Sequence, residues 1–220
     1  MRINKYVSMA SGISRRKVDN LLKTGVIKIN DQTAQMGQQV HPEDKIYLNN
    51  KILNLPQYTT IMLNKPVGYV VSRNGQGSKT IYNLIPNKFL NLKPVGRLDK
   101  DSSGLIILTN NGEFAHTLSH PSFSKQKIYI IKTNKKISDN DIDAINKGIE
   151  LSDGISHMRI SIDKNNSYKI QMHEGKNRQI RRTLNHLGYK IESLHRIKFA
   201  SFDLSDLQLG SYKEINIDDN

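Results

Sequence analysis

The N-terminal part of the chain shows two helical patterns followed by short β-branched stretches. Apolar residues at positions 3, 6, 7 and 10 share one helix face. A second helix is predicted from Ser14, a favourable N-cap, to Gly25, which suits the position after a helix C-terminus. Strands are predicted over residues 26–29 and 45–48. The pattern therefore predicts a small N-terminal helical module with a minor sheet.

From residue 60 onward the pattern changes to many short apolar stretches. We predict strands over 61–63, 69–71, 105–108, 128–131, 157–162, 168–172 and 191–199. Two helices interrupt them, one capped by Ser138 and one running from about Asn177 to Gly188. Many neighbouring strands with few helices favour a mixed, mainly antiparallel sheet. We therefore predict an α+β fold with two domains, residues 1–56 and 60–218, joined by a linker after Pro56.

The charge of the chain indicates a polyanionic partner. There are 33 Lys and Arg against 20 Asp and Glu, a net charge of +13, and nucleic acid is the leading candidate partner for such a surplus. Basic residues concentrate in two distant windows, 1–28 and 165–200, which suggests two contact surfaces for one long ligand. Arg15, Arg16 and Lys17 lie in the first turn of the second predicted helix, where the helix dipole disfavours cations. RNA or DNA binding explains them better than stability does.

Several classes of site and location are disfavoured by the residues present. The chain has no Cys, which excludes disulfides, thiolate metal sites and Cys nucleophiles. No stretch approaches the length of a membrane span, and the N-terminus lacks the apolar core of a secretory signal. The seven His show no convincing metal spacing, since His116 and His120 lack a third ligand. We expect a cytoplasmic protein without a metal site.

The segment 96–104 is the most unusual in the chain. It reads Gly-Arg-Leu-Asp-Lys-Asp-Ser-Ser-Gly and joins a strand ending near Val95 to the strand 105–108. Glycines at both ends allow a tight turn and a close approach to a ligand. An equally good reading from composition is a polar surface turn in which Arg97 pairs with Asp99.

A second segment, 174–182, ends one strand and opens a helix. Arg178 and Arg182 are four residues apart and share a face, while Arg181 points roughly 100° away from Arg182. One face is thus suited to phosphates, and Arg181 is free to turn inward to a carboxylate, because a guanidinium donates two parallel hydrogen bonds. The alternative is a solvated basic face.

Together these motifs, in this order, resemble those of bacterial ribosomal-RNA pseudouridine synthases. Residues 96–105 followed by 108–112 resemble the catalytic motif, with Ser102 where threonine is usual. Residues 1 to about 55 resemble the small RNA-binding domain named after ribosomal protein S-four. Further likenesses cover the first motif, the tyrosine motif, the arginine motif and the closing segment, at residues 63–69, 127–129, 174–182, and 194–197 with 209–212.

The resemblance implies an isomerase and assigns its residues. Asp99 is implied as the catalytic aspartate, Tyr129 as the active-site tyrosine and Arg181 as the arginine that pairs with the aspartate. The uracil of one uridine in RNA is detached, rotated and rejoined through carbon 5, with no cofactor and no metal. The carboxylate either attacks the sugar or removes a sugar proton, and the sequence leaves both open. Overall likeness favours 23S over 16S ribosomal RNA as substrate.

RNA contacts are expected from basic residues in both predicted domains. These are Arg2, Lys5, Arg15, Arg16, Lys17, Lys65, Arg97, Lys100, Lys176, Arg178 and Arg182. The expected partner is ribosomal RNA in an assembling subunit, bound by a monomer. The competing hypotheses are a non-catalytic RNA-binding assembly factor and, less well supported, a DNA-binding regulator. Asp99 favours the enzyme, since a pure binder gains nothing from an acid among phosphate-binding bases.

Overall fold

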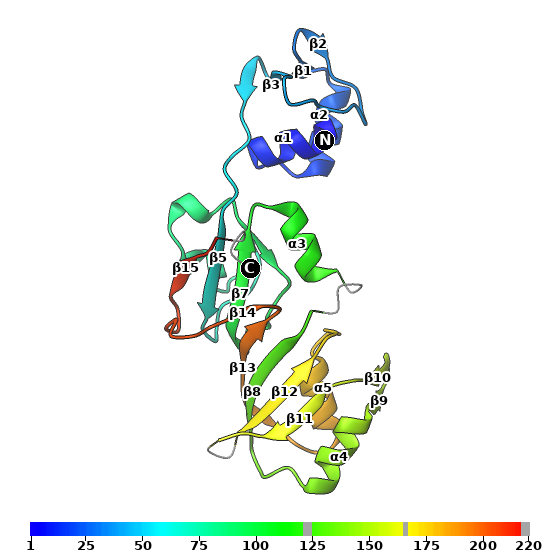
Figure 1. Cartoon of the computed structure of the whole chain (residues 1–220), viewed down its shortest axis with the longest axis vertical. Coiled ribbons are helices and arrows are strands. Elements are labelled where there is room, and N and C mark those ends of the chain that lie inside the picture. The colour runs from blue at the N-terminus through cyan, green and yellow to red at the C-terminus, as the bar shows by residue number, and fades with distance from the viewer. Residues whose placement is uncertain (121–124, 165–166, 217–220) are drawn as a thin grey trace. The chain divides into compact units, whose positions relative to one another are not determined.

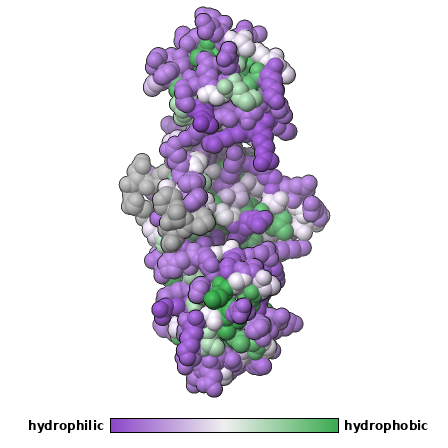
Figure 2. All heavy atoms as spheres, turned by 90° about the vertical axis from the view of Figure 1, so that its right-hand side faces the viewer, coloured by the Kyte–Doolittle hydropathy of each residue, from purple (hydrophilic) through white to green (hydrophobic). Residues whose placement is uncertain are grey.

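The chain divides into two compact units in the computed structural model, which describes residues 1–120, 125–164 and 167–216 (Figure 1). We call Met1–Tyr58 the N-terminal unit and Thr59–Asn220 the C-terminal unit. The face of the molecule in Figure 2 is mainly hydrophilic in both units, in keeping with the charge surplus. Among the described residues no helix has the length and apolar character that crossing a membrane requires.

The N-terminal unit packs two helices on a small antiparallel sheet. Both helices confirm the prediction, and the Ser14 hydroxyl accepts a hydrogen bond from the Lys17 amide at 3.4 Å, which caps the second helix. Ile3, Val7 and Val18 are fully buried between the helices and the sheet. The sheet order is β2-β1-β3-β4, in which β2 and β4 are additional to the predicted strands. The elements are α1 (Ile3–Ser11), α2 (Arg15–Lys23), β1 (Ile27–Ile29), β2 (Gln32–Thr33), β3 (Ile46–Leu48) and β4 (Lys51–Leu53).

The C-terminal unit is built on a nine-stranded sheet whose main path is β11-β12-β8-β13-β7-β5-β15, with β6 paired to β7 and β14 to β13. Among the described strands only β7 and β13 run parallel, so the sheet is mainly antiparallel as predicted. A separate pair, β9 and β10, forms a two-stranded sheet. The strands are β5 (Thr60–Lys65), β6 (Lys93–Val95), β7 (Ser103–Thr109), β8 (Lys127–Thr133), β9 (Ile149–Leu151), β10 (Gly154–Ser156), β11 (Arg159–Ile162), β12 (Tyr168–Met172), β13 (Ile191–Phe199), β14 (Phe202–Asp203) and β15 (Tyr212–Glu214).

Both faces of the central strands are covered, which explains their unbroken apolar runs. On β7, Ile106 and Leu108 belong to one apolar cluster, whereas Leu105 and Ile107 belong to another, and all four are fully buried. The alternation follows the two-residue repeat of a strand. Strands β5 and β7 are therefore the rigid centre from which the neighbouring loops project.

Three helices and two short 3-10 turns complete the unit. The helix predicted after Ser138 is confirmed, and the Ser138 hydroxyl accepts from the Asp141 amide at 3.1 Å. The helix predicted near 177–188 is confirmed over a shorter span, and α3 is additional. The predicted strand at 69–71 is wrong: after the turn at Gly68, Val70 makes only an isolated bridge to Thr80. The elements are η1 (Ile81–Leu84), η2 (Asn87–Phe89), α3 (Gly112–Ser119), α4 (Asp139–Lys147) and α5 (Gln179–His186).

Candidate active site

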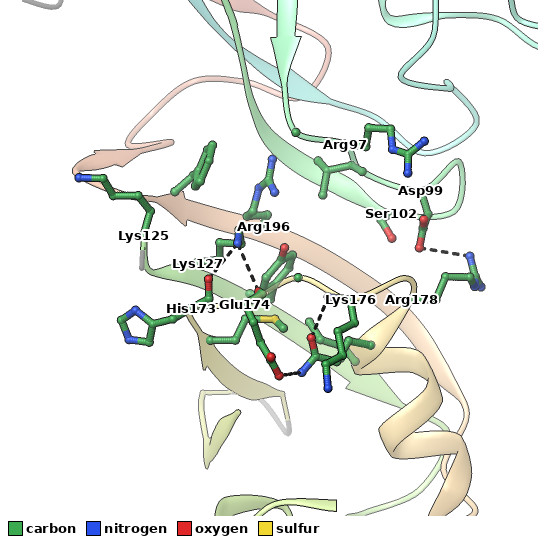
Figure 3. Close-up of a pocket in the computed structure, with 18 of the residues that line it drawn as sticks. Arg97, Asp99, Ser102, Lys125, Lys127, His173, Glu174, Lys176, Arg178 and Arg196 are labelled. Carbon is green, nitrogen blue, oxygen red and sulfur yellow. Dashed lines mark hydrogen bonds and ion pairs between the residues drawn. The ribbon is translucent and has the colours of Figure 1, made fainter. Parts of the chain in front are cut away.

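A cavity of about 550 Å³ opens in the C-terminal unit (Figure 3). Its walls come from the loop before β7, from β8, from the segment that leads into α5, and from β13. Asp99, Tyr129 and Arg181, the three predicted catalytic residues, all line it. Segments far apart in sequence thus meet at one place, as the sequence prediction requires.

Gly104 fixes how closely the catalytic loop approaches the centre of the sheet. It has a φ of 108° and pairs with Arg196 where β7 runs parallel to β13. A Cβ at this position would overlap the backbone of Arg196. Only glycine accepts both this φ and this approach. The loop that ends at Ser102 is therefore held directly over β13 and β8.

Asp99 makes its ion pair with Arg178, not with Arg181 as predicted. The Arg178 Nη1 atom lies 3.2 Å from Asp99 Oδ2, and the Asp99 side chain is 35% exposed. Arg181 instead approaches Asp101, with 3.3 Å between Nε and Oδ2, and Arg178 also reaches Asp101 at 3.0 Å. The alternative pairing of Asp99 with Arg97 is not the one formed among the described residues. Two carboxylates and two guanidiniums form a cluster at this edge of the cavity.

Arg181 is held beside Asp101 by the loop backbone. Its Nη2 atom donates to the Asp101 carbonyl at 2.8 Å and to the Ser102 hydroxyl at 3.3 Å. Burial lowers the pKa of Arg181, and its side chain is only 15% exposed. The hydrogen bond from Arg178, together with the charge of Arg181, lowers the pKa of Asp101. Ser102 keeps the hydroxyl that this contact uses, so serine serves in place of threonine.

Tyr129 lies on β8 between its partners Ile170 on β12 and Arg196 on β13. Its side chain is 8% exposed, belongs to the apolar core and also lines the cavity. The ring therefore presents an aromatic wall that is held firmly by the sheet. A flat ligand such as a nucleobase fits against such a wall.

Lys65 supports the catalytic loop from inside the protein, and the prediction that it contacts RNA is wrong. It is fully buried at the end of β5. Its Nζ atom donates to the Pro66 carbonyl at 3.0 Å and to the Ser102 carbonyl. Burial lowers the pKa of Lys65 to about 8, although the charges of Asp101 and Asp99 oppose the shift. A phosphate has no access to this ammonium group.

The remaining predicted cations of the C-terminal unit differ in position. Arg97, Lys176 and Arg178 line the cavity. Lys100 is exposed on the loop and donates to the Ser78 hydroxyl at 3.0 Å. Arg182 forms a two-pronged contact with Asp153, at 2.7 and 2.8 Å. The arginines of this segment therefore face two ways, toward the cavity and toward the β9–β10 turn.

The other five predicted cations lie on the N-terminal unit. Lys5 is half-buried in α1, and the others are exposed on the surface. No cluster of His, Asp and Glu suited to a metal is present in residues 1–120, 125–164 and 167–216. The exposed cations of this unit are Arg2, Arg15, Arg16 and Lys17.

Two basic residues in the cavity were not assigned from the sequence. Arg196 is 2% exposed, and its Nε atom donates to the Leu105 carbonyl at 2.8 Å. Lys127 donates to the carbonyls of His173 and Glu174, both at 3.2 Å. Burial, with the charge of Arg196, lowers the pKa of Lys127. An arginine at an inward position of the strand 191–199 was the available signal.

Comparison with known proteins gives a consistent result. Residues 59–186 match the family described as RNA pseudouridylate synthase. An uncharacterized RNA pseudouridine synthase of Aquifex aeolicus is 35% identical over 98% of this chain and 90% of its own length. The ribosomal large subunit pseudouridine synthase B of Bacillus subtilis is 31% identical over 97% of this chain and 91% of its own. The dual-specificity RNA pseudouridine synthase RluF of Escherichia coli K12 is 30% identical over the whole chain and 77% of its own.

A solved structure agrees with these relatives. A crystal structure of a pseudouridylate synthase superposes with a TM-score of 0.70 and 27% identity, and covers 100% of this chain and 97% of that one. Both units are therefore within the similarity.

Proposed function

Because this chain belongs to the RNA pseudouridine synthase family, we propose that it converts a uridine of ribosomal RNA to pseudouridine, with the large-subunit RNA as substrate. The large-subunit name of the Bacillus subtilis relative supports this choice of RNA. The observation that carries the proposal is the meeting of Asp99, Tyr129 and Arg181 in one cavity.

Each of these residues has a role in the proposed reaction. Asp99 is the carboxylate that starts cleavage of the glycosidic bond, by attack on the sugar or by removal of a sugar proton. Its ion pair with Arg178 keeps it charged and oriented. Arg181 is a positioning residue, since it binds the loop at Asp101 and Ser102. Tyr129 stacks against the uracil once the nucleotide has been extruded from the folded RNA, and its hydroxyl takes the proton from carbon 5.

RNA binding involves both units in this proposal. Around the cavity Arg97, Lys100 and Lys176 are placed to contact phosphates. We infer that the N-terminal unit is an RNA-binding domain of the ribosomal-protein-S-four type, on the basis of its two helices, its small sheet and the exposed cations of α2. Since bacterial ribosomal RNA is assembled in the cytoplasm, the proposal includes that location. The monomeric state stays a prediction.

The decisive test is release of tritium from RNA that carries it at carbon 5 of uridine. We expect release with unmodified 23S transcripts, and loss of release in Asp99→Asn with RNA affinity within about three-fold of the starting protein. Asp143→Asn is the matched control, because Asp143 is exposed on α4 outside the cavity. Turnover by Asp99→Asn would remove the catalytic assignment. Tight binding without any release would instead support the non-catalytic assembly factor.

The substrate is tested with the same assay. Release from 23S and not from 16S transcripts is expected, and release from 16S alone would overturn the large-subunit proposal. Chemical mapping of pseudouridines in ribosomal RNA from a strain that lacks the protein then identifies the target position.

A further inference from the structure

Arg196 is a buried cation whose hydrogen-bonding capacity is largely unused. Of its nitrogens only Nε has a partner, the Leu105 carbonyl at 2.8 Å. Nη2 is shielded from solvent and has no hydrogen-bond partner among the described residues. No carboxylate of those residues lies within ion-pair distance of the guanidinium. A buried charge without compensation destabilises a protein, so its retention indicates a ligand.

The surroundings of Arg196 make this part of the cavity positive. Its Cζ atom lies 5.0 Å from the centre of the Phe199 ring and 6.0 Å from that of the Tyr129 ring. Lys127 is two residues from Tyr129 on the same strand, and its pKa is lowered partly by the charge of Arg196. Two cations close together in a partly dry cavity favour a ligand that carries negative charge.

The position of Arg196 relative to Asp99 identifies which part of the substrate it meets. In Figure 3, Asp99 and Arg178 lie on one side of the cavity and Arg196 and Lys127 on the other. The Asp99 side is the sugar end, because the carboxylate acts on the sugar. Arg196 neighbours Tyr129 across the β8–β13 pair, and Tyr129 is the ring on which the base stacks. Arg196 is thus at the base end, away from the sugar.

We propose that Arg196 is a further catalytic residue, which donates hydrogen bonds to the uracil and stabilises the negative charge that the base carries while it is detached. This inference rests on the proposed function. When the bond between the sugar and nitrogen 1 breaks, its electron pair leaves with the uracil, and the ring carries one negative charge over nitrogen 1 and the carbonyl oxygens. Asp99 supplies electrons to the sugar, by bonding to it or by removing the adjacent proton.

The return step restores neutrality without any co-reactant. Carbon 5 of the rotated uracil bonds to the sugar and loses its hydrogen as a proton, and nitrogen 1 gains a proton. The product has the same composition as the substrate. A fixed guanidinium that meets the charge only in the detached state lowers the barrier of the chemical step more than it strengthens RNA binding.

The experiment compares Arg196→Met and Arg196→Lys with the starting protein under single-turnover conditions, with enzyme in excess over tritiated RNA. We expect Arg196→Met to lower the rate about 100-fold or more, as loss of one preorganised donor does, while the Kd for RNA changes by no more than about three-fold. Arg196→Lys keeps the charge and should regain part of the rate. Arg159→Met is the matched control, because Arg159 is exposed on β11 outside the cavity and this variant should match the starting rate.

A second substrate separates a catalytic role from a structural one. Fluorine at carbon 5 stabilises the detached, negatively charged base, so RNA with 5-fluorouridine should depend less on Arg196. Its consumption is followed as loss of 5-fluorouridine from nuclease digests. We expect the loss in Arg196→Met to be about ten-fold smaller with this RNA than with uridine. An equal loss on both RNAs would indicate only a structural role and overturn the proposal.

Two other results would also overturn it. An unchanged rate in Arg196→Met would show that the guanidinium does not act on the base. Weaker RNA binding with a salt slope lower by about one, at an unchanged rate, would show that Arg196 contacts a phosphate. Absence of tritium release from the starting protein itself would refute the proposed function, which makes the two failures distinguishable.

Discussion

Raising the pH should stabilise the C-terminal unit through Lys65. This residue is fully buried, and burial lowers the pKa of its ammonium group from 10.5 to about 8. Below pH 8 both the folded and the unfolded chain hold the proton, and the folded state bears the full cost of the buried charge. Between pH 8 and 10.5 the folded chain releases the proton first, so stability rises with pH over this interval.

The size of the effect follows from the two pKa values. Each pH unit over which only the unfolded chain keeps the proton adds about 1.4 kcal/mol, so the free energy of unfolding rises by up to about 3 kcal/mol between pH 8 and 10.5. Urea unfolding followed by circular dichroism at pH 7.5, 9 and 10.5 measures it, with Lys65→Met as the reference. Other titrating groups are common to both proteins and cancel in the difference.

A direct readout accompanies the stability curves. The Lys65 side-chain carbon signal in a ¹³C NMR titration should have its midpoint near pH 8, well below the midpoints of exposed lysines. Lys132→Met is the control, because Lys132 is exposed on β8 and its removal should leave the pH dependence unchanged. Parallel stability curves for the starting protein and Lys65→Met would refute the reasoning, since no proton would then be released on folding.

Three further outcomes are expected. Gly104→Ala should lower the free energy of unfolding by about 3 kcal/mol in urea, because of its φ of 108° and its contact with β13, whereas Gly112→Ala, with open space around it, should cost under about 1 kcal/mol. Arg178→Met should reduce tritium release about ten-fold or more, because the catalytic carboxylate loses its partner, and unchanged release would contradict that role. Arg15→Ala with Arg16→Ala should weaken RNA binding and flatten its salt dependence by roughly one slope unit per lost phosphate contact, and an unchanged slope would show that both arginines are merely solvated.

Signals that act within a few residues were predictable from the sequence. Ser14 and Ser138 identified the start of α2 and α4, because an N-cap hydroxyl acts on an amide three residues away. The glycine-bounded segment 96–104 was identified as a loop for the same reason. The mainly antiparallel sheet also followed from the density of strands.

Contacts between distant segments were not predictable in the same way. Arg178 takes a left-handed φ of 45° before α5, and it is Arg178 that reaches Asp99. Helix geometry alone favoured Arg181. Lys65 lies at the end of a strand, where nothing local distinguishes an ammonium held by backbone carbonyls from an exposed one. Arg196 likewise became recognisable only once its missing partners were visible.

The order of strands in the C-terminal unit has a consequence for its synthesis. Strand β7 depends on β13 for its parallel neighbour, and β5 depends on β15, although both partners are translated much later. Such distant pairings form slowly and only after both strands are available. A nascent chain that has emerged as far as α4 holds the aspartate loop but lacks the opposite wall of its pocket. Enzymatic competence is therefore acquired late in translation, so a partly made chain cannot modify the RNA of the ribosome that is producing it.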